Sequence, residues 1–161
     1  MPVDTEGRAL AAALERIGRR VLDELRELPE ELLNREIPIP EANTLFALAT
    51  HLVGSGEFWV LVMAGGRAIP RDRDAEFRAS GTYADLEGRY TRWIAEVGSV
   101  LSALPTDTLE SSAEPPAEYR GSVGQKPLTV RDCVLHALEH TALHLGHIQL
   151  TRSMLTQASP R

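Results

Sequence analysis

The chain has 161 residues, of which 43% are hydrophobic and 25% charged, and its formal net charge is −6. This length and composition are typical of one globular domain with its own core, so we treat residues 1–161 as a single domain. The acidic balance argues against a nucleic-acid surface. No segment approaches the roughly 20 apolar residues that cross a bilayer. We therefore expect neither a nucleic acid nor a membrane as a partner.

The cysteine content and the N-terminus bear on the cellular compartment. Cys133 is the only cysteine, which excludes an intramolecular disulfide and is consistent with a reducing environment. The first twenty residues mix charged and apolar side chains and lack the continuous apolar core of a signal peptide. We therefore expect a cytoplasmic protein.

A first amphipathic helix is predicted over Asp4–Leu28, where apolar residues recur at spacings of three and four. Pro29 ends this pattern. A short turn is expected over residues 30–34. Extended chain follows at Ile37–Pro40, because a residue that precedes proline disfavours the helical conformation.

A second helix is predicted over Asn43–Met63, with Asn43 as its N-cap and Gly65-Gly66 as its stop signal. This helix carries His51. Gly54 and Ser55 follow His51 at spacings of three and four, so they share its side of the helix. Such small residues leave space beside His51, and we expect a neighbouring helix or a ligand to occupy it.

The remaining chain alternates polar connections with two further helices. Residues Arg67–Gly81 are expected to form a loop, with a short helical turn as an option, and its charged residues Asp72, Arg73, Asp74 and Glu76 are expected to be solvated. A third helix is predicted over Tyr83–Leu104, capped by Thr82 or Ser80. The connection Thr106–Leu128 is unusually long, and connections of that length in compact domains are often functional. A brief strand or turn is expected within it, over residues 119–124.

The last helix is predicted over Thr129–Leu155, opening with a sequence that resembles a capping box at Thr129–Asp132. Four long helices with apolar faces, and almost no alternating strand pattern, predict an all-α four-helix bundle with long inter-helix connections. Because these connections are long, the helices need not alternate in direction.

Four of the five histidines lie in the last predicted helix, at spacings of four, four and three: His136, His140, His144 and His147. Residues at these spacings share one helix face, and two imidazoles four residues apart can converge on one metal ion. Apolar residues surround the histidine row, and buried polar rings are costly unless they have partners. A metal site in the bundle is one interpretation. The other is a polar face, or a row in which each ring bonds to backbone or carboxylate. Imidazole ligands favour zinc, nickel, copper or iron over magnesium or calcium.

Two sequence features together resemble the DinB/YfiT-like superfamily: the segment Asn43–Leu52, which contains His51, and the pattern His-x-x-x-His-x-x-x-His-x-Gly at His136–Gly146. The resemblance covers essentially the whole chain. It implies a four-helix bundle, commonly dimeric, with one divalent metal held by one histidine of the second long helix and two of the last. By resemblance, these ligands are His51, His140 and His144.

Several residues have roles that the resemblance leaves open. His147 stands where relatives often have glutamine, and it is a candidate for a fourth ligand, a supporting group or a substrate contact. His136 is expected beside the ligands, not among them. Glu139 either orients a ligating ring or faces solvent. Cys133 is expected to be a small buried apolar residue, with a thiolate ligand as the alternative. Trp59 and Trp93 are expected in the core or the pocket wall.

The resemblance also suggests an activity, because relatives include S-transferases and isomerases that use mycothiol or bacillithiol. It implies a divalent metal, for which zinc and nickel are the leading candidates and iron and manganese the further ones. It also implies a small-molecule thiol and an electrophile as substrates. The alternatives are a metal-dependent hydrolase and a non-enzymatic, stress-associated dimer that binds a metal or ligand. The pocket is expected between the second and last long helices, edged by residues 106–128, where Arg120 and Lys126 could meet an anionic cofactor.

Overall fold

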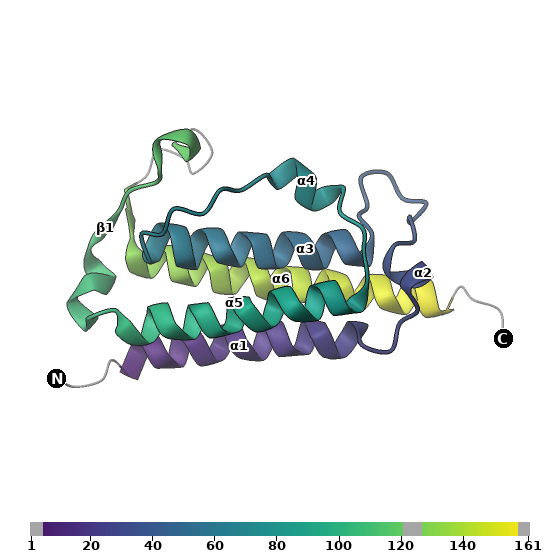
Figure 1. The fold of residues 1–161 in the computed structure, drawn as a ribbon, viewed down its shortest axis with the longest axis horizontal. Helices are drawn as coiled ribbons and strands as arrows, with labels where there is room; N and C mark the ends of the chain where they lie inside the picture. Colours follow the sequence, from purple (N-terminus) through teal and green to yellow (C-terminus); the bar gives the residue numbers. More distant parts are fainter. Residues whose placement is uncertain (1–4, 121–126, 158–161) are drawn as a thin grey trace.

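The computed structural model describes residues 5–120 and 127–157, and these form the predicted all-α bundle (Figure 1). Its four long helical segments are α1 (Thr5–Leu25), α3 (Leu45–Gly56) continued by η1 (Glu57–Ala64), α5 (Tyr83–Ala103) and α6 (Val130–Gln157). The shorter elements are α2 (Glu30–Leu33), α4 (Arg73–Phe77), η2 (Thr106–Glu110), β1 (Ser112–Ala113), η3 (Ala117–Tyr119) and β2 (Leu128–Thr129).

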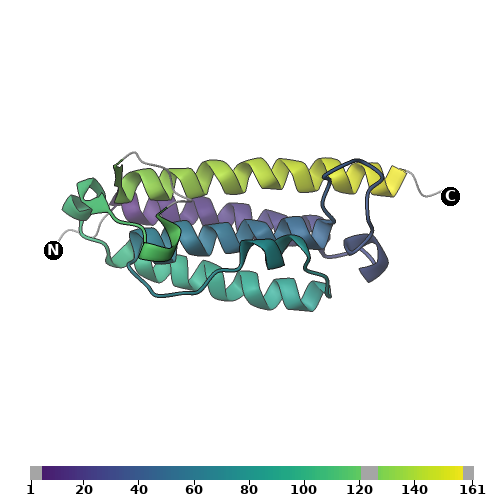
Figure 2. The same ribbon diagram turned by 90° about the horizontal axis from the view of Figure 1, so that it is seen from above.

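The four long segments do not alternate in direction. Followed along the chain in Figures 1 and 2, α1 and α6 run one way and α3 and α5 run the other. Helix α1 packs against α5 and α6, and α3 packs against α6 and α5. Because α5 begins at the end of the bundle where α3 also begins, the chain between η1 and α5 must return along the bundle. This return segment, residues 65–82, carries α4 over the outer side of α3 (Figure 1).

The core lies between the four long helical segments and is almost wholly apolar. Its largest members are Trp93 and Tyr90 of α5, both fully buried, and the Tyr90 hydroxyl donates a hydrogen bond to the Ala49 carbonyl at 2.8 Å. This bond fixes α5 against α3 and satisfies a phenol that would otherwise be a costly buried polar group. Trp93 therefore belongs to the core and not to the pocket wall.

The second long helix differs from the prediction at both ends. Thr44, not Asn43, caps α3, because its side chain accepts the Ala47 N–H at 3.1 Å. The final residues, Glu57–Ala64, form a π-helix where a continuous α-helix was predicted, and the Gly65 N–H bonds the carbonyl five residues earlier at 2.9 Å. Gly66 ends the helix with φ +66°, a conformation that glycine adopts without strain.

The connection before α6 is tied to the start of that helix by a small antiparallel ladder. β1 pairs with β2, with Ser112 opposite Thr129 and Ala113 opposite Leu128. Thr129 and Asp132 exchange the reciprocal hydrogen bonds of the predicted capping box, at 2.8 and 3.1 Å. Of the brief strand or turn expected over 119–124, a turn is found at Arg120, whereas Tyr119 lies in η3 and residues 121–124 lie outside the described ranges.

One helical stretch, Leu45–Ala64, has the length and apolarity of a membrane span, contrary to the expectation from sequence. However, 89% of its most apolar window is buried inside the fold. The apolar composition of this stretch is explained by its position in the fold, because α3 and η1 pack against α5 and α6 and the return segment covers α3.

Candidate metal centre

Three histidines meet where α3 faces α6. His51 comes from α3, and His140 and His144 come from successive turns of α6. One nitrogen of each ring lies within 4.8 Å of those of the other two. The ring centroids are 4.4 to 5.1 Å apart. These three histidines, the set implied by resemblance, are therefore placed to bind one metal ion.

The two α6 rings are held in the neutral, ligand-competent state. Burial, and then the neighbouring histidines, lower the pKa of both His140 and His144 to about 4. Metal binding requires neutral imidazole, so neither ring would have to lose a proton at neutral pH. Because these two rings are uncharged near neutral pH, they repel neither each other nor an incoming cation.

The same two rings lack protein partners. The Nδ1 atoms of His140 and His144 are buried, and neither has a hydrogen-bond partner within the described part of the chain. The alternative in which every histidine of the row bonds to backbone or carboxylate therefore fails for these two. Buried polar atoms without partners carry a free-energy penalty that a bound ligand or ion can offset. The donor set thus fits a metal ion.

His51 is oriented by a carboxylate that the sequence did not single out. Its Nδ1 lies 2.8 Å from Oε2 of Glu76, and both residues are nearly inaccessible, at 3% and 6% exposure. Since an imidazole has two ring nitrogens, this contact leaves Nε2 to face a metal. A carboxylate behind a ligating histidine fixes the ring and strengthens its basicity.

Arg71 completes this chain of contacts. Its Nε and Nη2 donate hydrogen bonds to the two Glu76 oxygens at 2.7 and 2.9 Å. Burial, the largest single influence, raises the pKa of Glu76, but hydrogen bonds from His51 and Arg71 outweigh it and lower that pKa. The carboxylate is therefore ionised, and its charge is shared between a guanidinium and the histidine it orients.

Glu76 can approach α3 because residue 54 is glycine. A Cβ atom at Gly54 would lie 2.2 Å from Oε1 of Glu76. The space predicted beside His51 is thus filled by the return segment. The prediction that Asp72, Arg73, Asp74 and Glu76 are solvated was wrong for Glu76, because the direction of α5 forces the return segment along the outer side of α3. It holds for Asp72, Arg73 and Asp74, which are exposed, and α4 is the short helical turn of this loop.

The other candidate residues of α6 lie beside the triad. His136 contacts Trp59 and His140 with ring centroids 4.2 and 5.8 Å apart, and the ring of His147 lies 5.3 Å from that of His144. Both are exposed, as is Glu139, so solvent and not a ligating ring surrounds that carboxylate. Cys133 is fully buried, and burial raises the pKa of its thiol to about 11, so it behaves as an apolar core residue.

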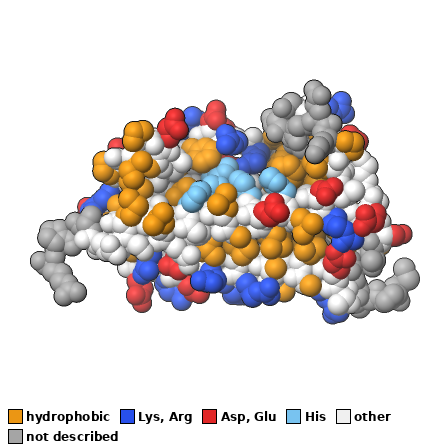
Figure 3. All heavy atoms as spheres, turned by 180° about the vertical axis from the view of Figure 1, so that it is seen from behind, with side chains coloured by type: hydrophobic (Ala, Val, Ile, Leu, Met, Phe, Trp, Pro, Cys, Tyr) orange, Lys and Arg blue, Asp and Glu red, His pale blue; other side chains and the backbone are white. Residues whose placement is uncertain are grey.

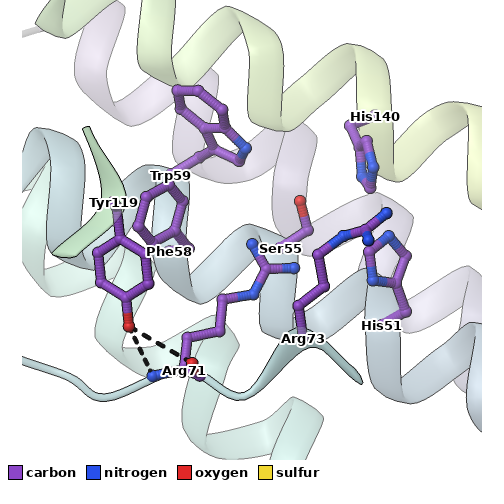
Figure 4. A pocket seen from close by; sticks show the side chains of 8 residues that line it. All are labelled: His51, Ser55, Phe58, Trp59, Arg71, Arg73, Tyr119 and His140. Carbon is purple, nitrogen blue, oxygen red and sulfur yellow. Dashed lines mark hydrogen bonds between the residues drawn. The ribbon is translucent and has the colours of Figure 1, made fainter. Parts of the chain in front are cut away.

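A cavity of about 430 Å³ opens beside the triad (Figure 4). It is lined by His51, Ser55, Phe58, Trp59, Arg71, Arg73, Tyr119 and His140. Trp59 therefore forms part of the pocket wall, one of the two positions expected for it. Tyr119 comes from the long connection before α6. Its ring packs on Phe58 at 4.9 Å between centroids, and its hydroxyl accepts the Arg71 N–H at 2.9 Å. The expected edge of the pocket is thus present, although Arg120 does not line it and Lys126 lies outside the described residues.

A second cavity, of about 420 Å³, lies on the other side of the triad and shares His51, Arg73 and His140 with the first. It extends along α6 past His144 and His147 to Thr151. In the space-filling view the histidines lie together in a hollow of one face, with basic and apolar side chains at its margin (Figure 3). The centre is therefore open to small molecules from two sides.

The fold and site together define an all-α bundle with a three-histidine centre at the interface of two core helices. Residues 13–148 match the DinB superfamily, which is most of the chain, so this protein belongs to that superfamily. The comparison with curated proteins gave no match.

Two solved structures share the fold. A conserved protein from Enterococcus faecalis superposes with a TM-score of 0.74 at 13% sequence identity, covering 98% of this chain and 99% of its own. A protein from Streptococcus pneumoniae superposes with a TM-score of 0.66 at 12% identity, covering 94% and 90%. At these identities the likeness extends to the fold alone.

Proposed function

We propose that this protein is a divalent-metal-dependent enzyme that transfers a low-molecular-weight thiol to an electrophile. The observation that carries the proposal is the group of three histidines, two of them with unpaired buried nitrogens, at a cavity large enough for a small molecule. Three protein ligands leave coordination positions for a substrate, which is typical of catalytic centres and not of structural ones.

His51, His140 and His144 would hold the metal, with Glu76 orienting His51. Imidazole ligands favour zinc or nickel, with iron or manganese as further candidates. When bound, such an ion lowers the pKa of a coordinated thiol, so that the nucleophilic thiolate predominates at neutral pH. The sulfur forms a bond to the carbon of the electrophile, whose leaving group departs with the bonding electron pair, and the thiol proton passes to solvent.

The composition of the pocket favours a thiol over water as the nucleophile. Among the described residues that line the cavity beside Phe58 and Trp59, none is acidic, and Glu76, which contacts the triad, is committed to His51 and Arg71. Glu41 lines only the second cavity. Metal hydrolases such as those with HExxH helices add a carboxylate base beside the metal. A thiol needs no such base. Cys133 is buried away from the cavity, so the thiol must be a separate molecule, with mycothiol and bacillithiol the candidates from related enzymes.

We further propose a cytoplasmic homodimer that associates through α6. Four large apolar side chains are exposed on one side of this helix: Leu135, Leu143, Leu150 and Met154. Exposed apolar patches of this kind mark interaction surfaces. The single buried cysteine supports a reducing compartment.

The test of the enzymatic proposal uses protein purified without a polyhistidine tag or added metal. Elemental analysis is expected to find one transition metal per chain. The metal-loaded protein is then mixed with mycothiol or bacillithiol and monochlorobimane, whose chloride is displaced as the fluorescent conjugate forms. A rate above that of the uncatalysed reaction, lost on removal of the metal by a chelator, supports a transferase.

Two results would contradict it. Metal-loaded protein that accelerates the reaction of neither thiol, yet retains its metal, favours the non-enzymatic metal-binding dimer. Protein that hydrolyses an activated ester at a metal-dependent rate without any thiol favours the hydrolase.

A further inference from the structure

We propose that Arg73 binds a carboxylate of the small molecule that enters the cavity beside the triad. The inference rests on the proposed function only in taking this cavity as the substrate site. It assigns a recognition role to a residue that the metal centre does not use.

The first argument is the charge balance of the cavity. Two guanidinium groups, Arg71 and Arg73, line it, and no described lining residue is acidic. The charge of Arg71 is largely offset by its ion pair with Glu76. Arg73 has no ion pair with any residue of 5–120 or 127–157. Glu41 lines only the second cavity and forms no ion pair with Arg73, so the first cavity presents an uncompensated positive group in a chain whose net charge is −6.

The second argument is the position of Arg73. It lines both cavities that meet at the triad, and Figure 4 shows its guanidinium beside the rings of His51 and His140. Its Cζ lies 5.0 Å from the centroid of the Phe77 ring, which stacks on His51 at 4.3 Å. A cation–π contact holds the guanidinium near the triad without using its N–H donors. The donors stay available to a ligand.

The third argument concerns the kind of anion. The planar fork of one arginine matches the two oxygens of a carboxylate, whereas a phosphate dianion gains from several cationic donors. Arg71 adds little net charge for a dianion, because Glu76 occupies two of its five donors and offsets its positive charge. The opposite wall is formed by Phe58, Trp59 and Tyr119. The ligand class is thus an organic carboxylate with a flat apolar body.

The experiment measures binding and not turnover, with no thiol present. Benzoate and its neutral counterpart benzamide are titrated into zinc-loaded protein, and the indole N–H resonance of Trp59 is followed by NMR. Trp93, which lies in the core, provides the internal reference. Arg73→Gln is compared with Arg78→Gln, which removes the same charge from an exposed position of the same segment that lines neither cavity.

Wild-type protein and the Arg78 variant are expected to bind benzoate more tightly than benzamide. Arg73→Gln should weaken benzoate binding about tenfold, the loss of one charge-assisted hydrogen bond, and leave benzamide unchanged. The difference in benzoate affinity between wild-type protein and Arg73→Gln should persist in chelator-treated protein. This control separates recognition by Arg73 from direct coordination of the benzoate carboxylate to zinc. Circular dichroism confirms that the variants are folded.

Equal benzoate affinity in the two variants would overturn the proposal, as would tighter binding of phenyl phosphate than of benzoate. The outcome is independent of the thiol reaction. Loss of benzoate binding in Arg73→Gln supports the inference even if no thiol is transferred, and its retention refutes the inference even if thiol transfer is observed.

Discussion

Glu76 lies with its Oε2 atom 2.8 Å from Nδ1 of His51, a contact that joins α4 of the return segment to α3 beneath it. The contact leaves His51 one nitrogen with which to face His140 and His144. The buried Glu76 carboxylate is tolerated beside the apolar helix α3 because its ion pair with Arg71 offsets its charge.

Replacement of Glu76 by glutamine should lower the affinity for zinc. A neutral amide holds the His51 ring less firmly and donates less electron density, and loss of such a supporting group costs about 10- to 100-fold in metal affinity. Competition with a chromophoric chelator measures the change. Asp74→Asn, an exposed substitution on the same short helix, is the control and should bind zinc as the wild type does. Equal affinity in both variants would contradict the role of Glu76.

Substitution of Gly54 by alanine should reproduce much of that loss without touching a titratable group. The new Cβ would lie 2.2 Å from Oε1 of Glu76, so the carboxylate must move away from His51. Gly88→Ala on α5 is the matched control, because a Cβ there meets nothing within 4 Å. That variant should retain zinc and gain up to about 1 kcal/mol of stability from helix propensity. Undiminished zinc binding by the Gly54 variant would show that zinc affinity does not depend on the observed position of Glu76.

The ligand assignment predicts unequal effects along the histidine row. Alanine at His140 or His144 should abolish stoichiometric zinc, because two remaining imidazoles cannot hold the ion tightly. Alanine at His136 or His147 should leave it in place, since these rings lie outside the group of three. Elemental analysis after dialysis distinguishes them, with circular dichroism to confirm helicity. Retained zinc in the His140 variant would refute the assignment.

The stability of metal-free protein should fall between pH 6.5 and pH 4. His140 and His144 have folded-state pKa values of about 4, below the ordinary 6.5, so in this range the unfolded chain binds protons that the folded rings do not. With up to two such protons, the unfolding free energy decreases by up to about 2.7 kcal/mol per pH unit. Urea denaturation at a series of pH values measures the slope. His144→Gln should reduce it, and an unchanged slope would contradict the depressed pKa values.

The proposed dimer predicts sensitivity to charge on the exposed apolar face of α6. Glutamate at both Leu143 and Leu150 should give a monomer by light scattering, because two carboxylates cannot be buried at an apolar contact without partners. Ser102→Glu, exposed on α5, should leave the assembly unchanged. A monomeric wild-type protein would refute the proposal outright.

The helices and the pair of histidines on α6 could be predicted from sequence because both follow from local spacing. Apolar periodicity gives the four long helices, and the interval of four residues brings His140 and His144 together. Resemblance to a known family supplied His51 as the third member. The π-helical end of the second long segment could not be foreseen, since its sequence is compatible with an ordinary α-helix.

The supporting residues Glu76, Arg71 and Arg73 could not be predicted, because they belong to a polar stretch with no periodicity. Their position depends on the parallel course of α3 and α5, which is a property of the whole chain. The one local signal was Gly54, a small residue three positions after His51, and it indicated close approach without identifying the partner.

The triad joins parts of the chain that are far apart, since His51 and His140 are 140 − 51 = 89 positions from each other. The centre therefore cannot form in either half of the protein alone, and pairing of such distant residues is a late and slow event in folding. An ion that binds only the assembled helices stabilises them by mass action, by about 2.7 kcal/mol at a concentration one hundred times its dissociation constant. The supply of metal in the cell would then influence how much of this protein survives proteolysis, in addition to any effect on its chemistry.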